Sequence, residues 1–299
     1  MRIWLSGAGG FVGSNLAEVF AASGAELAAP RRAEVDVTDA GAVDRSIGEF
    51  GADAVVHCAI LNELTGLSEH RRAAWDGYVG ATRNVVDAAN RAGAQVVLIS
   101  TDWVFDGTQA PAAEDEPPNP VNTYGFLKAA CELVVEERAD RGAVARIAGV
   151  QGVHRARPNT LRVQDEGFGY LVASLVDALR VGEPFTVWES NRINTVATPT
   201  LATDVGALIL RMLERGRTGI HHCVGGEHAS RAELARAAVD VFELDGDLLR
   251  FGPPPAPSGA LVPYDTRLDA TATAAALDVE LPSLRAQLEQ LRREFDSAR

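Results

Sequence analysis

The chain has 299 residues, of which 46% are hydrophobic and 23% are charged, so it can bury the core of one large domain or of a domain with a smaller annex. Its formal net charge of −13 argues against a nucleic-acid-binding surface. Cys58, Cys131 and Cys223 are far apart and no metal-spaced His/Cys cluster occurs, which is typical of reduced thiols in a cytoplasmic protein and predicts no metal site. No apolar run reaches membrane-spanning length, so we expect a soluble protein without a membrane partner.

The N-terminus carries a candidate phosphate-binding loop. Residues 1–6 predict a strand and residues 14–22 a helix, and the loop between them is rich in glycine. In such loops Gly7 permits the tight turn, Gly10 lets the backbone approach a pyrophosphate, and Gly13 lets the helix pack closely on the strand. The free N–H groups of the helix N-terminus would face the phosphates. The pattern therefore predicts a Rossmann-type dinucleotide site.

The residues after the second predicted strand bear on the choice of cofactor. Strand 25–29 is followed by Arg31 and Arg32, where an NAD-binding chain usually has an acidic residue that accepts from the ribose. Arginine can bind the 2′-phosphate of NADP. We expect NADP(H), with NAD(H) as the alternative because Glu34 is close by. Asp36 could meet the adenine amino group.

The chemistry is expected where the buried strand 95–99 ends. Ser100 and Thr101 follow it at the carboxyl edge, where parallel sheets place function. On the next predicted helix, Tyr124 and Lys128 are four residues apart and share one face. A tyrosine with a pKa of about 10 is a poor acid at neutral pH, so we expect the Lys128 ammonium to lower the pKa of Tyr124. Thr101, or alternatively Ser100, can hold the substrate oxygen while the phenol transfers its proton.

The C-terminal half combines a basic loop with further helices. Four basic residues in the polar stretch 153–167 can bind a diphosphate or a carboxylate, or belong to a solvated loop. They are His154, Arg155, Arg157 and Arg162. Helices are predicted over 40–50, 124–138, 168–181, 230–242 and 281–295. Ser230 and Glu233 form a capping box at the start of helix 230–242. A further helix is predicted to begin at a cap, Thr203 or Asp204, and to end at Arg215. Strands are predicted over 54–59, 142–147 and 185–188, and residues 191–200 are expected to return to the sheet.

Five motifs in one order carry a family resemblance. They are the glycine loop, the run Asp36-Val37-Thr38-Asp39, the run from Ser100 to Gly107, the pair Tyr124 and Lys128, and Thr198-Pro199-Thr200. Together they resemble the extended short-chain dehydrogenase/reductases, and among these the dTDP-4-dehydrorhamnose reductases. The resemblance implies an α/β fold with a Rossmann-type doubly wound parallel sheet and a smaller C-terminal substrate-binding domain. It places the NAD(P)-binding domain at residues 1–150 with returning segments at about 168–225, and the substrate-binding portion at 151–167 and 226–299.

The resemblance also implies roles for individual residues. Tyr124 becomes the general acid, Lys128 holds the nicotinamide ribose and lowers the pKa of the phenol, and Thr101 polarises a keto oxygen. Implied cofactor contacts are Gly7, Gly10, Phe11, Val12, Gly13, Arg31, Arg32, Asp36, Val37, Cys58, Ala59, Ser100, Tyr124 and Lys128. Implied substrate contacts are Thr101, Asp102, Trp103, Val104, Phe105 and Arg192. The implied reaction is reduction of the keto group of a nucleotide-linked 4-keto-6-deoxyhexose.

Two departures from the family pattern leave other functions open. Tyr78 stands where the family usually has an asparagine in the proton relay behind the lysine, and Asn62 to Thr65 replace the usual Ala-Ala-Tyr-Thr. The alternatives are reduction of another small ketone and a noncatalytic NADP-binding regulatory subunit. Dehydration is not expected, because Asp102 is followed by Trp103 and not by a glutamate. A homodimer is expected by analogy with similar proteins.

Overall fold

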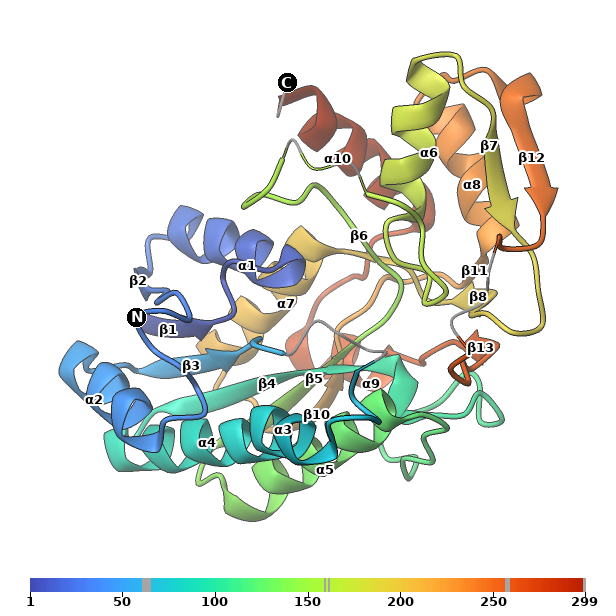
Figure 1. The fold of residues 1–299 in the computed structure, drawn as a ribbon. Helices are drawn as coiled ribbons and strands as arrows, with labels where there is room; N and C mark the ends of the chain where they lie inside the picture. Colours follow the sequence, from blue (N-terminus) through green and yellow to red (C-terminus); the bar gives the residue numbers. More distant parts are fainter. Residues whose placement is uncertain (61–65, 159, 161, 256–258, 298–299) are drawn as a thin grey trace.

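A six-stranded parallel sheet forms the centre of the protein, whose computed structural model describes residues 1–60, 66–158, 160, 162–255 and 259–297. The strand order is β10-β5-β4-β3-β1-β2 (Figure 1). The strands are β1 (Arg2–Ser6), β2 (Glu26–Ala28), β3 (Ala54–His57), β4 (Gln95–Thr101), β5 (Gly142–Ile147) and β10 (Gly219–His222). The inner strands are short apolar runs, as a sheet that is covered on both faces requires.

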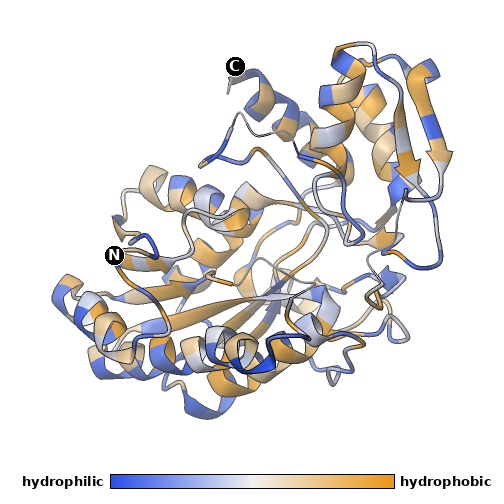
Figure 2. Ribbon diagram, in the orientation of Figure 1, coloured by the Kyte–Doolittle hydropathy of each residue, from blue (hydrophilic) through white to orange (hydrophobic). Residues whose placement is uncertain are grey.

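Helices cover both faces of this sheet. One face carries α1 (Phe11–Ala22) and α7 (Ala202–Glu214), and the other carries α2 (Ala40–Phe50), α4 (Ala81–Ala92) and α5 (Thr123–Arg138) (Figure 1). Figure 2 shows apolar residues concentrated on the strands and polar residues on the outer sides of the helices. The prediction of a Rossmann-type, doubly wound parallel sheet is confirmed.

A second group of elements packs around a core of its own. It contains α6 (Leu171–Arg180), α8 (Arg231–Val241), α10 (Leu284–Ser297), β7 (Phe185–Trp188) and β12 (Leu249–Gly252). A small sheet of β11 (Ala229–Ser230), β8 (Val196–Ala197) and β13 (Asp265–Thr266) lies between this group and the main sheet (Figure 1). In the expected returning segment, α7 and β10 pack with the main sheet, whereas α6 and β7 pack in the second group. The division at residue 150 stays a prediction.

The remaining described elements are short. They are α3 (Arg71–Trp75), a π-helical turn (Asp76–Gly80), 3-10 turns (Asp102–Val104 and Gly246–Leu248), β6 (Val150–Gln151), β9 (Thr200–Leu201) and α9 (Thr271–Leu277). Among the described residues, no helix combines the length and the apolar character needed to cross a membrane. The unusual run from Asn62 to Thr65 lies outside the described residues.

Three local expectations need correction. Residues 191–200 do not return to the main sheet, because β8 joins the small sheet and β9 pairs with β6. Helix α6 begins at Leu171 instead of 168, since Phe168 and Tyr170 adopt left-handed backbone with φ of 74° and 56°. Neither Thr203 nor Asp204 caps α7, whose N-cap is Leu201. By contrast, the predicted capping box at the start of α8 is present.

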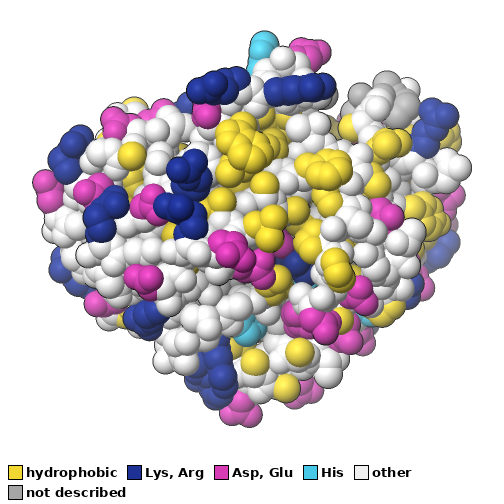
Figure 3. Space-filling view, turned by 90° about the horizontal axis from the view of Figure 1, so that it is seen from below, with side chains coloured by type: hydrophobic (Ala, Val, Ile, Leu, Met, Phe, Trp, Pro, Cys, Tyr) yellow, Lys and Arg dark blue, Asp and Glu magenta, His cyan; other side chains and the backbone are white. Residues whose placement is uncertain are grey.

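Apolar side chains are exposed on the helices below the sheet. Trp75 on α3 is 50% exposed, and Phe126 and Leu133 on α5 are 60% and 59% exposed. Figure 3 views the molecule from below and shows hydrophobic side chains gathered in a band among scattered charged groups. An exposed apolar band of this kind is typical of a surface that contacts another protein.

A buried ion pair ties α5 to the sheet. Glu132 and Arg146 are 1% and 0% exposed, and the Arg146 Nη2 atom lies 2.9 Å from Glu132 Oε2. The Ser100 hydroxyl also donates to the Glu132 carboxylate. The Arg146 guanidinium lies over the Phe105 ring, 4.9 Å from its centroid. These contacts fix the helix that carries Tyr124 against β4 and β5.

We expect Glu132→Gln to lower the free energy of unfolding by about 3 kcal/mol, because it leaves the Arg146 charge buried without its partner. Urea denaturation measures this difference. The matched control is Arg72→Gln, which breaks an exposed pair with Asp76 and should hardly change the midpoint. Equal, small effects of both substitutions would show that the buried pair does not stabilise the fold.

Candidate active site

The glycine loop lies where the strand order reverses, between β1 and β3. Gly7 has a φ of +78°, and a Cβ atom there would lie 2.7 Å from the backbone nitrogen of Ala59. The Ser6 Oγ accepts from the backbone N–H groups of Cys58 and Ala59, each at 3.2 Å. Its own proton is therefore directed to His57 Nδ1, 2.8 Å away. The two strand ends are thus held together at the edge where such sheets bind ligands.

His57 has a structural role in this arrangement. Its ring is buried, and burial lowers its pKa to about 3, with the Lys128 charge as a second cause. The ring is consequently neutral at physiological pH and accepts from Ser6. His57 is therefore a hydrogen-bonded structural residue at the end of β3.

A pocket of about 250 Å³ opens beside the glycine loop. Its lining includes eight of the predicted cofactor residues: Gly7, Gly10, Arg31, Arg32, Asp36, Val37, Cys58 and Ala59. Gly77 and Arg157 also line it and were not predicted as cofactor contacts. The sequence signal for Arg157 was the basic stretch 153–167, which was expected to bind a diphosphate or a carboxylate or to be a solvated loop.

The two arginines at one end of this pocket are suited to a phosphate group. Arg31 and Arg32 are exposed, and Arg32 makes only a loose contact with Asp36 at 3.5 Å. Glu34, the residue that left NAD open, does not line this pocket, and its carboxylate accepts from the Arg31 backbone N–H at 2.7 Å. Asp36 accepts from the Thr38 backbone and hydroxyl, which hold its pKa below the usual value.

Three predicted loop residues, Phe11, Val12 and Gly13, do not line the pocket. The Phe11 ring packs against Tyr170 and His154, with centroids 4.9 Å and 6.0 Å away. Val12 packs on the core under α1, and Gly13 lies buried in the first turn of that helix. These three residues therefore shape the loop and its contact with the basic stretch.

Arg155 of the basic stretch is engaged in a structural contact. Its guanidinium contacts Glu18 on α1 and Glu294 on α10, both at 3.1 Å. Arg162 instead lies over the Tyr170 ring, 5.2 Å from its centroid. The basic stretch thus bridges the main sheet's helices and the second group of elements.

The start of α5 places Tyr124 against the end of β4. The Asn122 side chain caps the helix by accepting from the Gly125 N–H at 2.9 Å. A Cβ atom on Gly125 would overlap the Trp103 carbonyl oxygen, so only glycine allows this approach. The Tyr124 ring is packed edge-on by Trp103 and by Tyr78, with centroids 5.9 Å and 6.2 Å away.

Thr101 lies between Tyr124 and a buried carboxyl group. The Thr101 Oγ1 donates to Asp102 Oδ1 at 3.0 Å and accepts from the Trp103 N–H at 3.2 Å. The same hydroxyl is beside the Tyr124 phenol and favours its ionised form. Asp102 is 4% exposed, and burial raises its pKa to about 7. The Thr101 hydroxyl, the Asp102 carboxyl and the Tyr124 phenol thus lie together at the end of β4.

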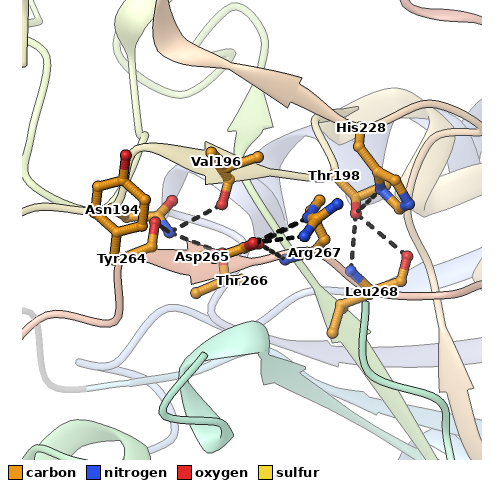
Figure 4. A network of polar contacts seen from close by, with 9 residues as sticks. All are labelled: Asn194, Val196, Thr198, His228, Tyr264, Asp265, Thr266, Arg267 and Leu268. Atoms are coloured by element: carbon orange, nitrogen blue, oxygen red, sulfur yellow. Dashed lines mark hydrogen bonds and ion pairs between the residues drawn. The ribbon is translucent and has the colours of Figure 1, made fainter. Parts of the chain in front are cut away.

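Residues of β13 flank this cluster. Asn194 Nδ2 donates to the Thr266 Oγ1 at 3.0 Å, and the Thr266 hydroxyl favours the ionised form of Asp102. Figure 4 shows how the neighbouring segment is fixed: Arg267 pairs with Asp265 at 2.7 Å, and the Leu268 N–H donates to Thr198 Oγ1 at 2.9 Å. The hydrogen-bonded small sheet therefore places the Thr266 hydroxyl next to Asp102.

The expectation that Lys128 lowers the pKa of Tyr124 is wrong for this structure. Burial raises the pKa of the phenol, and this effect exceeds that of the Thr101 hydroxyl, which lowers it. Lys128 is 4% exposed, and its amino group donates to the Ile99 carbonyl oxygen. Burial also lowers the pKa of Lys128. Tyr124 is consequently protonated at neutral pH, as a proton donor must be.

Several other predicted site side chains are placed away from the cluster. The Ser100 hydroxyl is buried and donates to Glu132, so it cannot hold a substrate oxygen. Val104 and Phe105 are 0% and 2% exposed in an apolar core, which leaves them a supporting role. Arg192 is exposed in a turn before β8.

Tyr78 occupies the π-helical turn that leads into α4. Its side chain is 2% exposed, and the Thr82 hydroxyl donates to its backbone carbonyl at 2.8 Å. Its ring supports Tyr124, and no amide is present at this position to take part in a relay. The site therefore retains the predicted Thr101, Tyr124 and Lys128, and the Tyr78 ring packs on Tyr124 where the family pattern has an asparagine.

Comparisons with known proteins identify the family. A family model described as RmlD substrate binding domain matches residues 1–297. The chain belongs to this family. The resemblance to dTDP-4-dehydrorhamnose reductases that the motifs indicated is thereby confirmed.

The proteins similar to this RmlD-family chain include methionine adenosyltransferase subunits as well as reductases. Methionine adenosyltransferase 2 subunit beta of Bos taurus is 29% identical over 281 residues, which cover 90% of this chain and 80% of that protein. The dTDP-4-dehydrorhamnose reductase of Mycobacterium tuberculosis is 27% identical over 261 residues, covering 83% and 78%. Among solved structures, the dTDP-4-dehydrorhamnose reductase of Bacillus anthracis in complex with NADP has a TM-score of 0.81 and 21% identity, with 98% of both chains covered.

The raised pKa of Asp102 predicts a pH-dependent effect of Asp102→Asn on stability. Between pH 4 and pH 7 the folded protein binds a proton that the unfolded chain, with an Asp pKa of 3.8, has lost. The stability of the wild type therefore falls relative to that of the variant as pH rises through this range. Thermal melts at pH 5 and pH 8 should show the Tm difference shifting in favour of the variant at pH 8. The same Tm difference between wild type and variant at pH 5 and pH 8 would contradict the raised pKa of Asp102.

Proposed function

We propose that this RmlD-family protein reduces a keto group on a sugar with NADPH, and that its substrate is a nucleotide-linked 4-keto-6-deoxyhexose. The observation that carries the proposal is the buried cluster of Thr101, Tyr124 and Lys128 at the end of β4. Cys58 connects it to the dinucleotide pocket, since it lines that pocket and is close enough to affect the pKa of both Tyr124 and Lys128.

The residues of the pocket fit a dinucleotide. Because Gly7 has no Cβ, the turn of the loop can pack directly against the backbone of Ala59. Arg31 and Arg32 line the pocket and can pair with a 2′-phosphate. The NADP complex of the Bacillus anthracis reductase supports NADPH as the first cofactor to test, with NADH as the alternative. When bound, the nicotinamide would supply the hydride.

The chain's own residues supply the proton and the orientation. Thr101 donates a hydrogen bond to the keto oxygen, and Tyr124 gives its proton to that oxygen as negative charge develops. The raised pKa keeps the phenol protonated until the oxygen becomes a stronger base than tyrosinate. Lys128, whose amino group donates to the Ile99 carbonyl in this structure, would hold the nicotinamide ribose. Trp103 and Tyr78 hold the phenol ring in place.

We expect the double substitution Arg31→Ala and Arg32→Ala to weaken NADPH binding at least tenfold and to leave NADH binding nearly unchanged, because only NADPH carries the 2′-phosphate. Cofactor fluorescence titrations measure both affinities. Arg91→Ala, which removes an exposed arginine paired with Asp44, is the matched control for net charge. Equal losses of affinity for NADPH and NADH would show that these arginines do not select for the 2′-phosphate.

We expect wild type to oxidise NADPH in the presence of a dTDP-4-keto-6-deoxyhexose, and Tyr124→Phe to reduce kcat about 100-fold or more. The substitution removes the proton but retains the ring that packs on Trp103 and Tyr78. Nicotinamide absorbance follows turnover, and fluorescence checks that NADPH still binds. Tight NADPH binding without turnover in wild type would exclude this sugar and direct the assays to other small ketones.

A regulatory subunit is the second candidate function. The relatives named methionine adenosyltransferase 2 subunit beta and the tyrosine at position 78 favour it. In that case the protein would bind a methionine adenosyltransferase catalytic chain, and Tyr124→Phe would leave the complex and its activity unchanged. The two functions are thus separated by the same variant.

Two further properties are part of the proposal. The exposed apolar side chains Trp75, Phe126 and Leu133 support a homodimer through the lower helices. The free cysteines support a cytoplasmic location.

A further inference from the structure

Asp102 is a buried carboxyl group that the proposed reaction does not yet use. Its side chain is 4% exposed, and its Oδ2 atom has no hydrogen-bond partner. The other oxygen, Oδ1, accepts from the Thr101 hydroxyl at 3.0 Å. A buried carboxylate oxygen without a partner is destabilising when charged, whereas a protonated carboxyl tolerates the same place.

A structural role does not explain a carboxyl at this position. The turn at Asp102 is closed by backbone, since the Phe105 N–H donates to the Asp102 carbonyl oxygen at 3.1 Å. The Thr101 contact would be kept by an asparagine, whose amide oxygen also accepts. What distinguishes aspartate from asparagine here is a proton that it can release.

The groups around Asp102 define where this proton can go. Thr101 contacts Asp102 through its hydroxyl, and the same hydroxyl lies beside the Tyr124 phenol. The Lys128 amino group is turned to the Ile99 carbonyl. From β13, the Thr266 hydroxyl faces the carboxyl, and the nearby Arg267 guanidinium is held by Asp265. Thr101 is therefore the hydroxyl through which Asp102 reaches Tyr124.

We propose that Asp102 is the proton reserve of the site and reloads Tyr124 through the Thr101 hydroxyl. This inference rests on the proposed reduction. After Tyr124 has protonated the new alkoxide, the Thr101 hydroxyl turns its proton from Asp102 Oδ1 to the tyrosinate and gives it up, and Thr101 Oγ1 takes the proton of the Asp102 carboxyl across the same 3.0 Å contact. The product leaves as an alcohol, and the Asp102 carboxylate regains a proton from solvent once the site opens. One hydride and one proton are consumed in each turnover.

The decisive variant is Asp102→Asn, which keeps the acceptor for Thr101 and removes the proton. We expect kcat at pH 6 to fall about tenfold. At pH 9 the wild-type carboxyl is ionised, so both proteins lack the reserve and their kcat values should converge. A merely structural effect would give the same ratio at every pH, and that result would overturn the proposal.

The matched control is Asp106→Asn, four residues along the same segment. Its carboxylate accepts from the Thr108 N–H and hydroxyl, both at 2.7 Å, and its pKa lies below the usual value. Its kcat should follow that of wild type at both pH values. If Asp106→Asn also lowered kcat at pH 6 and matched wild type at pH 9, the pH dependence would not be specific to Asp102. That result would overturn the proposal.

A second measurement needs no ketone. Infrared spectra of the protein with NADPH should show a protonated carboxyl band at pH 6 that disappears by pH 9 and is missing in Asp102→Asn. Absence of the band at pH 6 would overturn the proposal that Asp102 holds a reserve proton. If the band is present and wild type reduces no ketone, then the proposed function fails while the protonated Asp102 stands.

Discussion

Burial of polar groups between β4 and α5 is the constraint on which the site depends. The same loss of solvent raises the pKa of Asp102 and of Tyr124 and lowers that of Lys128 and His57. Each of these groups is shifted toward its neutral form. The cluster therefore holds protons on its acids and carries few fixed charges.

Two buried carboxyl groups near the end of β4 meet this constraint differently. Glu132 is paired with Arg146 and hydrogen-bonded by Ser100, so its charge is compensated. Asp102 has neighbouring hydroxyl and backbone N–H groups but no cation as a partner among the described residues, and its Oδ2 atom has no hydrogen-bond partner, so burial outweighs these neighbours and raises its pKa. The first carboxyl fixes α5 against the sheet, and the second remains free to exchange a proton. Charge compensation thus separates the supporting residue from the reactive one.

The fold was predictable because its signals are local. Apolar runs gave the strands, the glycine loop gave the first turn, and the spacing of Tyr124 and Lys128 gave a shared helix face. The chemistry of the site was only partly predictable, since burial is a property of the packed protein. The sequence could not show that Lys128 donates to the Ile99 carbonyl.

The same limit explains the other misplaced residues. Ser100 and Thr101 are adjacent hydroxyl residues, but alternation along β4 sends them to different partners, Glu132 and Asp102. Val104 and Phe105 belong to a motif that carries function, yet their side chains fill the core that supports it. Arg157 is distant in sequence from the glycine loop, so only the fold brings it to the pocket.

The presence of Thr101, Tyr124 and Lys128 does not by itself separate an enzyme from a subunit, because a dinucleotide-binding subunit could retain the same groups to hold its ligand. Asp102 is more informative. A subunit would gain nothing from a carboxyl whose ionisation destabilises the fold at neutral pH, and asparagine would preserve its contact with Thr101. A reductase without an amide at position 78 needs another route to reprotonate Tyr124. The unpartnered carboxyl is the group in this cluster that can supply it, and it therefore favours catalysis.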